Sequence, residues 1–147
     1  MSDQVTCSAI VSFAQRLEEA SSKFYEELAG KYAEGRETFL VFARECIKNK
    51  VLVTRTYQET ISDALEACFI QMDLSNYPSE IALNEGQSYQ VALEAAIKLE
   101  ENAGRFYSDA AEQSKSLLAT IPRAFKRAAE RRNGRRARLK TILDKSK

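Results

Sequence analysis

The sequence predicts an all-α, antiparallel four-helix bundle with a long crossover between the second and third helices. Three observations lead to this fold class. Apolar residues recur at helical spacing over most of the 147 residues. The chain holds only five Gly and two Pro, too few for the many tight turns of a sandwich or barrel. One helical pattern also occurs twice, which divides a single domain into a first repeat at about 5–58, a crossover at about 59–87 and a second repeat at about 88–145.

The first repeat is expected to form two helices. Apolar residues at steps of three, four and seven define the first of them: Ile10, Phe13, Leu17, Phe24 and Leu28. Gly30 and Gly35 bracket the break after it, and the second helix begins near Arg36. Residues 38–42 and 51–54 could also be read as strands. Because no hairpin turn separates them and the helical spacing continues on either side, we favour a buried helix.

The crossover and the second repeat follow. Ser62 and Asp63 indicate the cap of a short helix within the crossover, and residues 73–78 read as a loop. The third helix is expected from near Ser88 to Gln113. The fourth is expected from about 121, with Pro122 in its first turn, to about 143. A crossover of ~25 residues can span the ~30 Å length of a 20-residue helix.

The composition excludes several classes of site. There is no histidine, which removes His general bases, Ser-His-Asp and Cys-His nucleophile systems, and metal sites built on imidazole. The three cysteines (Cys7, Cys46 and Cys68) show no CxxC spacing, and an odd count suits a reducing compartment better than a disulfide framework. The start of the chain lacks the features of a signal peptide, and no apolar run approaches 18 residues. We therefore expect a cytoplasmic protein with no membrane partner.

The charge of the chain is unevenly distributed. Residues 1–122 hold 11 Lys and Arg against 19 Asp and Glu, whereas residues 123–147 hold 11 against 2. The basic run on the last helix consists of Arg123, Lys126, Arg127, Arg131, Arg132, Arg135, Arg136, Arg138 and Lys140. Such a run can bind phosphate groups or an acidic partner. We favour complementarity with the acidic helices of the same bundle or of a second subunit, because no RNP, KH or helix-turn-helix pattern supports nucleic-acid binding.

The internal repeat carries a specific resemblance. Residues 17–29 and 99–111 share the pattern L-E-E-x4-F-Y-x-[E/D]-x-A, which contains Glu18 and Tyr25 in one copy and Glu100 and Tyr107 in the other. The chain resembles the ferritin-like superfamily, in particular its rubrerythrin branch, which carries E-x6-Y on the first and third helices. The resemblance covers nearly the whole chain. It implies a bundle in which two glutamates and two Glu-x-x-His pairs hold two iron or manganese ions.

The Glu-x-x-His half of the motif is degenerate in both copies. The register set by Phe39 places Cys46 and Asn49 at the ligand positions, and the register set by Phe125 places Arg132 and Arg135 there. Shifting the register supplies Glu45 with Lys48, or Glu130 with Asn133, but never a histidine. Glu18 and Glu100 therefore remain as candidate metal ligands, with Glu45 and Glu130 as further possibilities. Cys46 could be a reactive thiolate beside Lys48 and Lys50, although we favour a small core residue.

The two arginines suggest a different role for the glutamates. Phe125, Ala128, Arg132, Arg135, Leu139 and Ile142 share one helical stripe. Because a buried guanidinium without a partner is costly, we expect Arg132 or Arg135 to form an internal ion pair with Glu18 or Glu100. Alternatively the helix is rotated and both arginines are solvated.

These patterns lead to one principal functional hypothesis and two alternatives. We expect a rubrerythrin-related protein that has lost its His-containing metal site, is non-catalytic, has no cofactor, and acts through protein association as a homodimer or with an unknown protein partner. One alternative is an oxidoreductase that binds iron or manganese through carboxylates alone. The other is anion or nucleic-acid binding through the basic fourth helix.

Overall fold

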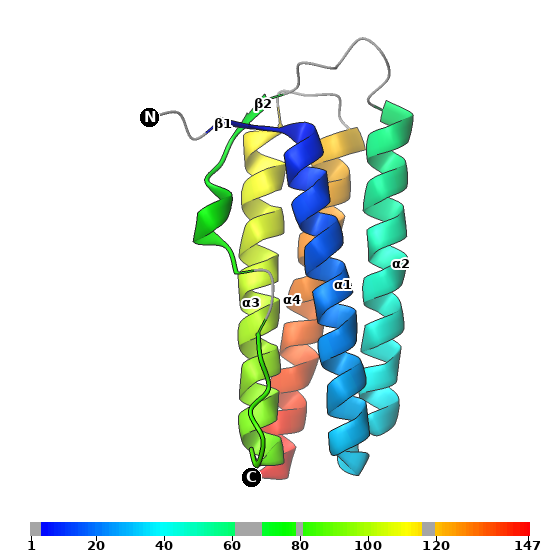
Figure 1. The fold of residues 1–147 in the computed structure, drawn as a ribbon, viewed down its shortest axis with the longest axis vertical. Coiled ribbons are helices and arrows are strands. Elements are labelled where there is room, and N and C mark those ends of the chain that lie inside the picture. The colour runs from blue at the N-terminus through cyan, green and yellow to red at the C-terminus, as the bar shows by residue number, and fades with distance from the viewer. Residues whose placement is uncertain (1–3, 61–68, 79–80, 116–119) are drawn as a thin grey trace.

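The computed structural model describes residues 4–60, 69–78, 81–115 and 120–147 and shows a four-helix bundle. Its helices are α1 (Cys7–Lys31), α2 (Arg36–Thr60), α3 (Tyr89–Gln113) and α4 (Thr120–Ser146). The most extensive contacts lie within the pairs α1–α2 and α3–α4, and α2 also packs on α4. In Figure 1, α2 and α3 run in the same direction, so the segment between them returns along the length of the bundle. The predicted fold class is confirmed.

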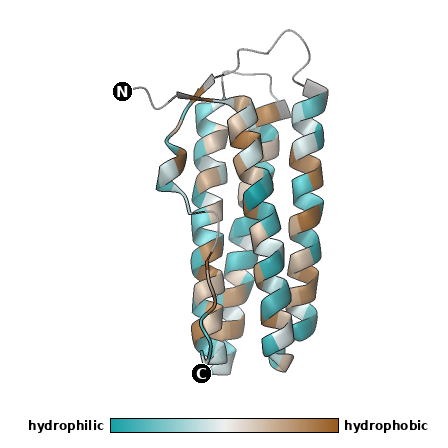
Figure 2. Cartoon of the chain, viewed as in Figure 1, coloured by the Kyte–Doolittle hydropathy of each residue, from teal (hydrophilic) through white to brown (hydrophobic). Residues whose placement is uncertain are grey.

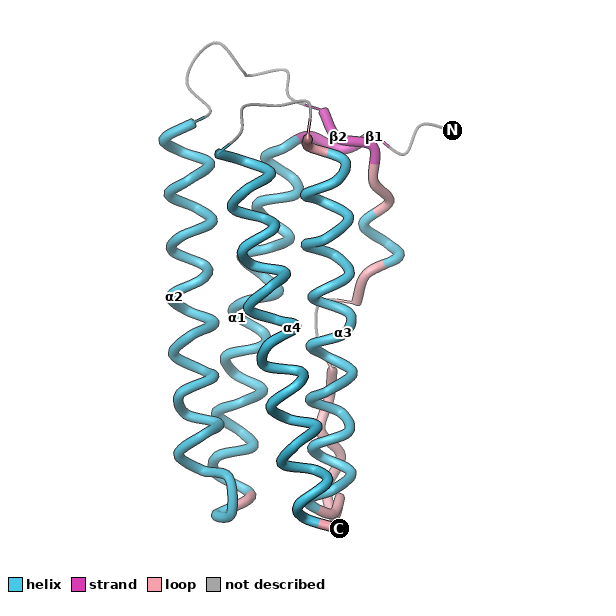
Figure 3. Tube along the Cα trace, turned by 180° about the vertical axis from the view of Figure 1, so that it is seen from behind, coloured by secondary structure: helices cyan, strands magenta, loops and turns pink. Residues whose placement is uncertain are grey.

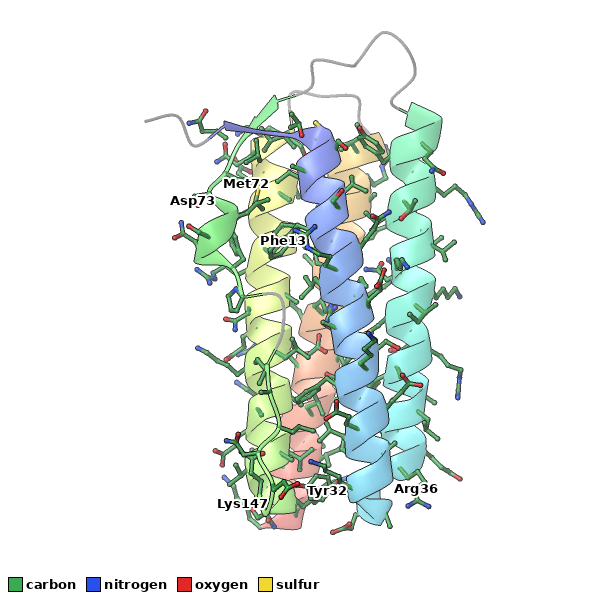
Figure 4. All side chains as sticks on the ribbon, in the orientation of Figure 1. Phe13, Tyr32, Arg36, Met72, Asp73 and Lys147 are labelled. Atoms are coloured by element: carbon green, nitrogen blue, oxygen red, sulfur yellow. The ribbon has the colours of Figure 1, made fainter. Side chains whose placement is uncertain are left out.

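Local sequence accounts for the helix boundaries. The Thr6 side chain accepts a hydrogen bond from the Ala9 amide and caps α1, and the Ser88 side chain accepts one from the Val91 amide and caps α3. The turn Ala33–Gly35 separates α1 from α2, next to Tyr32 and Arg36 (Figure 4). Residues 38–42 and 51–54 are helical, so the strand interpretation is wrong.

A two-stranded sheet closes one end of the bundle, which the sequence did not lead us to expect. Strand β1 (Gln4–Thr6) pairs antiparallel with β2 (Phe69–Gln71), with Val5 opposite Ile70. Figure 3 shows the pair at the end of the molecule where the N-terminus lies. The sheet thereby joins the start of α1 to the crossover.

The crossover lies against the outside of the hairpins. Leu74–Asn76 forms one 3-10 turn within the segment predicted as a loop. In Figure 4, Met72 and Asp73 lie beside α3, and Tyr77 donates its hydroxyl hydrogen to Asp109 of α3. The short helix predicted around Ser62 and Asp63 falls outside the described residues.

The helices are amphipathic, with apolar and polar positions alternating along each of them (Figure 2). Their apolar faces enclose an aromatic core in which, for example, the Phe13 and Phe106 rings lie 4.7 Å apart. Among the described helices, none has an apolar stretch of the length that a membrane span requires. Cys46 is a free, buried thiol, whereas Cys7 is disulfide-bonded, so the fully reduced state suggested by the cysteine count is wrong for Cys7. Cys68 lies outside the described residues.

Candidate functional site

Two acidic and two basic side chains are buried within the apolar core at the centre of the bundle. Glu18 of α1 and Glu100 of α3 face Arg132 and Arg135 of α4, and none of the four is more than 5% exposed. The Arg132 guanidinium lies between the two carboxylates, with Nη2 2.9 Å from Glu18 Oε1 and Nη1 3.2 Å from Glu100 Oε1. Arg135 Nη1 lies 3.3 Å from Glu100 Oε2. The four formal charges cancel, which offsets the high cost of burying each of them.

Two tyrosines complete the environment of the carboxylates. Tyr107 donates its hydroxyl hydrogen to Glu18 Oε2 at 2.5 Å, and Tyr25 donates to Glu100 Oε2. Burial, followed by the charge of Glu100, raises the pKa of Tyr25 well above its usual range. Burial and the charge of Glu18 do the same to the pKa of Tyr107. Both phenols therefore keep their protons and serve as hydrogen-bond donors.

Further polar side chains extend this arrangement toward α2. Asn49 Nδ2 donates to Glu18 Oε2 at 3.0 Å, and Arg131 Nη1 donates to Asn49 Oδ1 at 3.0 Å. On the other side, Arg132 Nη2 donates to Ser21 Oγ at 3.0 Å. Glu18 Oε1 is close to Arg132 without the alignment of a hydrogen bond, so this contact is an ion pair alone. We call this set the central network, and its members are Glu18, Ser21, Tyr25, Asn49, Glu100, Tyr107, Arg131, Arg132 and Arg135.

Cys46 lies at the edge of the central network. Arg135 Nη1 approaches its sulfur at 3.5 Å, while Arg135 Nη2 lies 3.1 Å from Glu45 Oε1. Burial raises the pKa of the Cys46 thiol to about 12, more than the neighbouring arginines lower it. The thiol is therefore protonated at neutral pH, which argues against the reactive thiolate considered from the sequence.

The structure brings together some of the sequence-predicted residues and separates others. Glu18, Glu100, Arg132 and Arg135 meet in the centre, so the alternative in which both arginines are solvated is wrong. Glu45 is half exposed and reaches this centre only through Arg135. Glu130 is exposed on α4, away from the buried Glu18 and Glu100.

The same geometry distinguishes the two registers of the degenerate motif. The positions of the Phe39 and Phe125 register are all buried: Cys46, Asn49, Arg132 and Arg135. Those of the shifted register are all exposed: Glu45, Lys48, Glu130 and Asn133. The first register is therefore the one that faces the central glutamates.

Sequence reasoning missed several members of the central network. From the sequence, Tyr25 and Tyr107 were included only as part of the repeat pattern and Asn49 only as a degenerate ligand position, and Ser21 was not included. The signal for the tyrosines was the E-x6-Y spacing, because seven residues are two helical turns and place Tyr on the same face as Glu. For Asn49 the signal was its register position, which placed it opposite Glu18 and so indicated the hydrogen bond between them.

The donor set does not match a metal centre. Within residues 4–60, 69–78, 81–115 and 120–147, no group of three or more His, Cys, Asp or Glu side chains is placed to hold a metal ion. Both central carboxylates already accept hydrogen bonds or ion pairs from an arginine and a tyrosine. Comparison of the chain with protein-family models, with curated proteins and with solved structures gives no significant match.

Proposed function

We propose that this chain is a ferritin-like, rubrerythrin-related bundle in which arginine side chains take the place of the two metal ions, and that it acts through protein association and not as a catalyst. The observation that carries the proposal is the position of Arg132, whose guanidinium bridges the two glutamates that the repeat pattern marks as ligand positions. A guanidinium supplies a fixed positive charge and several directed N–H donors, which suit two facing carboxylates.

Two further features support the ferritin-like part of the proposal. The connectivity matches, with two helical hairpins and a crossover that runs the length of the bundle (Figure 1). Of the four positions that correspond to Glu-x-x-His pairs, Asn49, Arg132 and Arg135 contact the two glutamates, and Cys46 contacts Arg135.

The exposed face of α2 supports the association. Leu40, Ile47 and Val51 are 37%, 44% and 46% exposed, and their spacing of seven and four residues aligns them on one side of the helix. We call these three residues the α2 stripe and propose that a second copy of the chain packs on it, because coiled-coil spacing suits pairing with an identical helix.

Metal content tests the first part of the proposal. Untagged protein, expressed with added iron and manganese, should carry no stoichiometric metal by mass spectrometry. Roughly two ions per chain would instead favour the carboxylate-only oxidoreductase, the alternative from the sequence.

Restoration of the ligands tests the family assignment independently. The variant Cys46→Glu, Asn49→His, Arg132→Glu, Arg135→His places a Glu-x-x-His pair on α2 and on α4, and it should bind about two ions per chain. The matched control, Lys48→His with Asn133→His, creates the same pairs with Glu45 and Glu130 in the exposed register and should bind none at the bundle centre. Circular dichroism checks that both variants are helical. Equal metal binding by the two variants would contradict the assignment.

A further inference from the structure

A second feature of the molecule lies outside the proposed function. Between α2 and α4 there is a pocket of about 430 Å³, open to solvent. It forms where these helices pack less closely than the helices within each hairpin. Pockets of about 300–1,000 Å³ are typical of small-molecule sites.

The polar residues of the pocket are mostly basic. Lys48 comes from α2, and Arg131 and Arg138 come from α4. Within the described part of the chain, none of these three side chains forms an ion pair. The one carboxylate of the pocket, Glu45, is already paired with Arg135. The pocket therefore presents an excess of positive charge.

Two of these cations are held in place by contacts other than ion pairs. Arg131 is fixed by its hydrogen bond to Asn49, and the Arg138 guanidinium lies 5.5 Å from the centre of the Phe42 ring. Arg135 also lines the pocket, but it is only 5% exposed, and its guanidinium is already paired with Glu45 and Glu100. An anion in the pocket would therefore pair with Lys48, Arg131 and Arg138, the lining cations that form no ion pair within the described residues.

A glycine inside α4, Gly134, also lines the pocket. Glycine is unfavourable in the interior of a helix, so a glycine there calls for a reason. At Gly104 on α3 the reason is close packing, because a Cβ would lie 2.8 Å from Asn133 Oδ1. At Gly134, which lines the pocket, a Cβ would meet nothing within 4 Å. The missing side chain leaves room in the pocket without serving any contact between helices.

We infer that the pocket between α2 and α4 binds a phosphate group, as inorganic phosphate or as a phosphomonoester. A phosphate carries about −1.5 to −2 charges at neutral pH and three strong acceptor oxygens, which match several unpaired cations better than a single carboxylate does. The site is a single pocket with room for one small ligand. A nucleic-acid duplex would require a longer basic track.

The test is calorimetric titration of the full chain with inorganic phosphate and, separately, with glycerol 1-phosphate, at constant ionic strength in chloride. Saturable binding of one ligand per chain is expected, together with a shift of the Gly134 amide signal in the NMR spectrum. The ligand that binds more tightly identifies free phosphate or phosphomonoester as the natural source. Absence of saturable binding of either ligand would overturn the inference.

Matched variants locate the binding. Lys48→Gln with Arg138→Gln should weaken binding at least tenfold. Arg127→Gln, which removes an exposed positive charge elsewhere on α4, should change it less than twofold. Glu45→Gln removes the one carboxylate among the described residues that line the pocket, and it should strengthen binding, a result that simple damage to the fold would not produce. Equal weakening by the Arg127 variant would overturn the inference, because it would indicate general attraction to a basic helix.

Filling the pocket provides the last check. Gly134→Leu should abolish phosphate binding while the thermal stability stays the same or rises, since leucine favours the helix. Phosphate binding retained by this variant would overturn the assignment. The assignment would also be overturned if a DNA duplex bound more tightly than phosphate and if Arg127→Gln weakened duplex binding as much as Lys48→Gln with Arg138→Gln.

Discussion

Tyr25 of the first repeat donates its hydroxyl hydrogen to Glu100 of the second repeat. The reciprocal bond runs from Tyr107 of the second repeat to Glu18 of the first. The repeated pattern is therefore completed across the bundle, and each hairpin supplies the donor that the other hairpin's carboxylate needs.

Removing one of these tyrosine hydroxyl donors should lower the stability of the protein. Tyr107→Phe is expected to lower the free energy of unfolding by about 1.5–3 kcal/mol, the usual range for a hydrogen bond to a charged group. Urea denaturation followed by circular dichroism measures it. The control is Tyr32→Phe, whose hydroxyl donates at 2.8 Å to the neutral carbonyl of Gln87 and should cost about 0.5–1.5 kcal/mol. An equal cost for both substitutions would contradict a charge-assisted bond at Tyr107.

The ion pair between Arg132 and Glu100 should show strong coupling. Arg132→Met leaves two buried carboxylates with one remaining arginine and should destabilise the protein by about 3–5 kcal/mol. Adding Glu100→Gln should recover part of this loss, which a double-mutant cycle measures. The comparison cycle is Arg136 with Glu101, a surface pair at 3.1 Å that should couple by no more than about 1 kcal/mol. Strictly additive effects in the buried cycle would rule out the pair.

Alkaline pH should destabilise the protein through Cys46. Its pKa rises from 9.0 to about 12 in the folded state, so the unfolded chain loses this proton first. The contribution of the protonated Cys46 thiol to the free energy of unfolding is complete below pH 9 and is lost as the pH rises through 12. The expected loss is about 1 kcal/mol between pH 9 and pH 10. Urea denaturation at both pH values measures it, and Cys46→Ala should remove most of the difference. The tyrosines of the central network add a further loss above pH 10.

Two glycines should respond to alanine with opposite signs. A Cβ at Gly35 would lie 2.7 Å from Phe39 Cε2 and 2.8 Å from the Tyr89 hydroxyl, and the Phe39 ring is fully buried. Gly35→Ala should therefore cost about 1–3 kcal/mol through overpacking. A Cβ at Gly30, inside α1, would meet nothing within 4 Å, so Gly30→Ala should stabilise by about 0.5–1 kcal/mol. Thermal denaturation measures both, and a shift of the same sign for the two variants would contradict the packing argument.

The α2 stripe should control self-association. Ile47→Lys with Val51→Lys places two charges on the proposed contact and should convert a dimer to a monomer in sedimentation equilibrium. Val91→Lys is the matched control, because Val91 is 43% exposed on a different helix and should leave the dimer intact. A wild-type protein that is monomeric at all concentrations would contradict the proposed association.

The sequence predicted those parts of the molecule that depend on local pattern. The expected range of the third helix, from near Ser88 to Gln113, agrees with α3 within one residue. The stripe through Phe125, Arg132 and Leu139 favoured one of the two alternatives for Arg132, the buried one that the structure shows. In each case the residues concerned lie within a few turns of one another.

Features that depend on distant segments were not predictable in this way. The strand pair places Val5 opposite Ile70, and three-residue strands carry almost no periodic signal of their own. The crossed tyrosine–glutamate bonds depend on how the two hairpins dock. The pocket between α2 and α4 depends in addition on a missing side chain, and such a gap becomes visible only when both helices are in place.

The position of Arg132 also affects what the protein requires from its surroundings. A resident metal ion must be acquired, so a protein that depends on one is more stable when the metal is abundant and less stable when it is scarce. The charge between Glu18 and Glu100 is covalently part of the chain. One such guanidinium is synthesised with every pair of carboxylates, and no chelator can remove it.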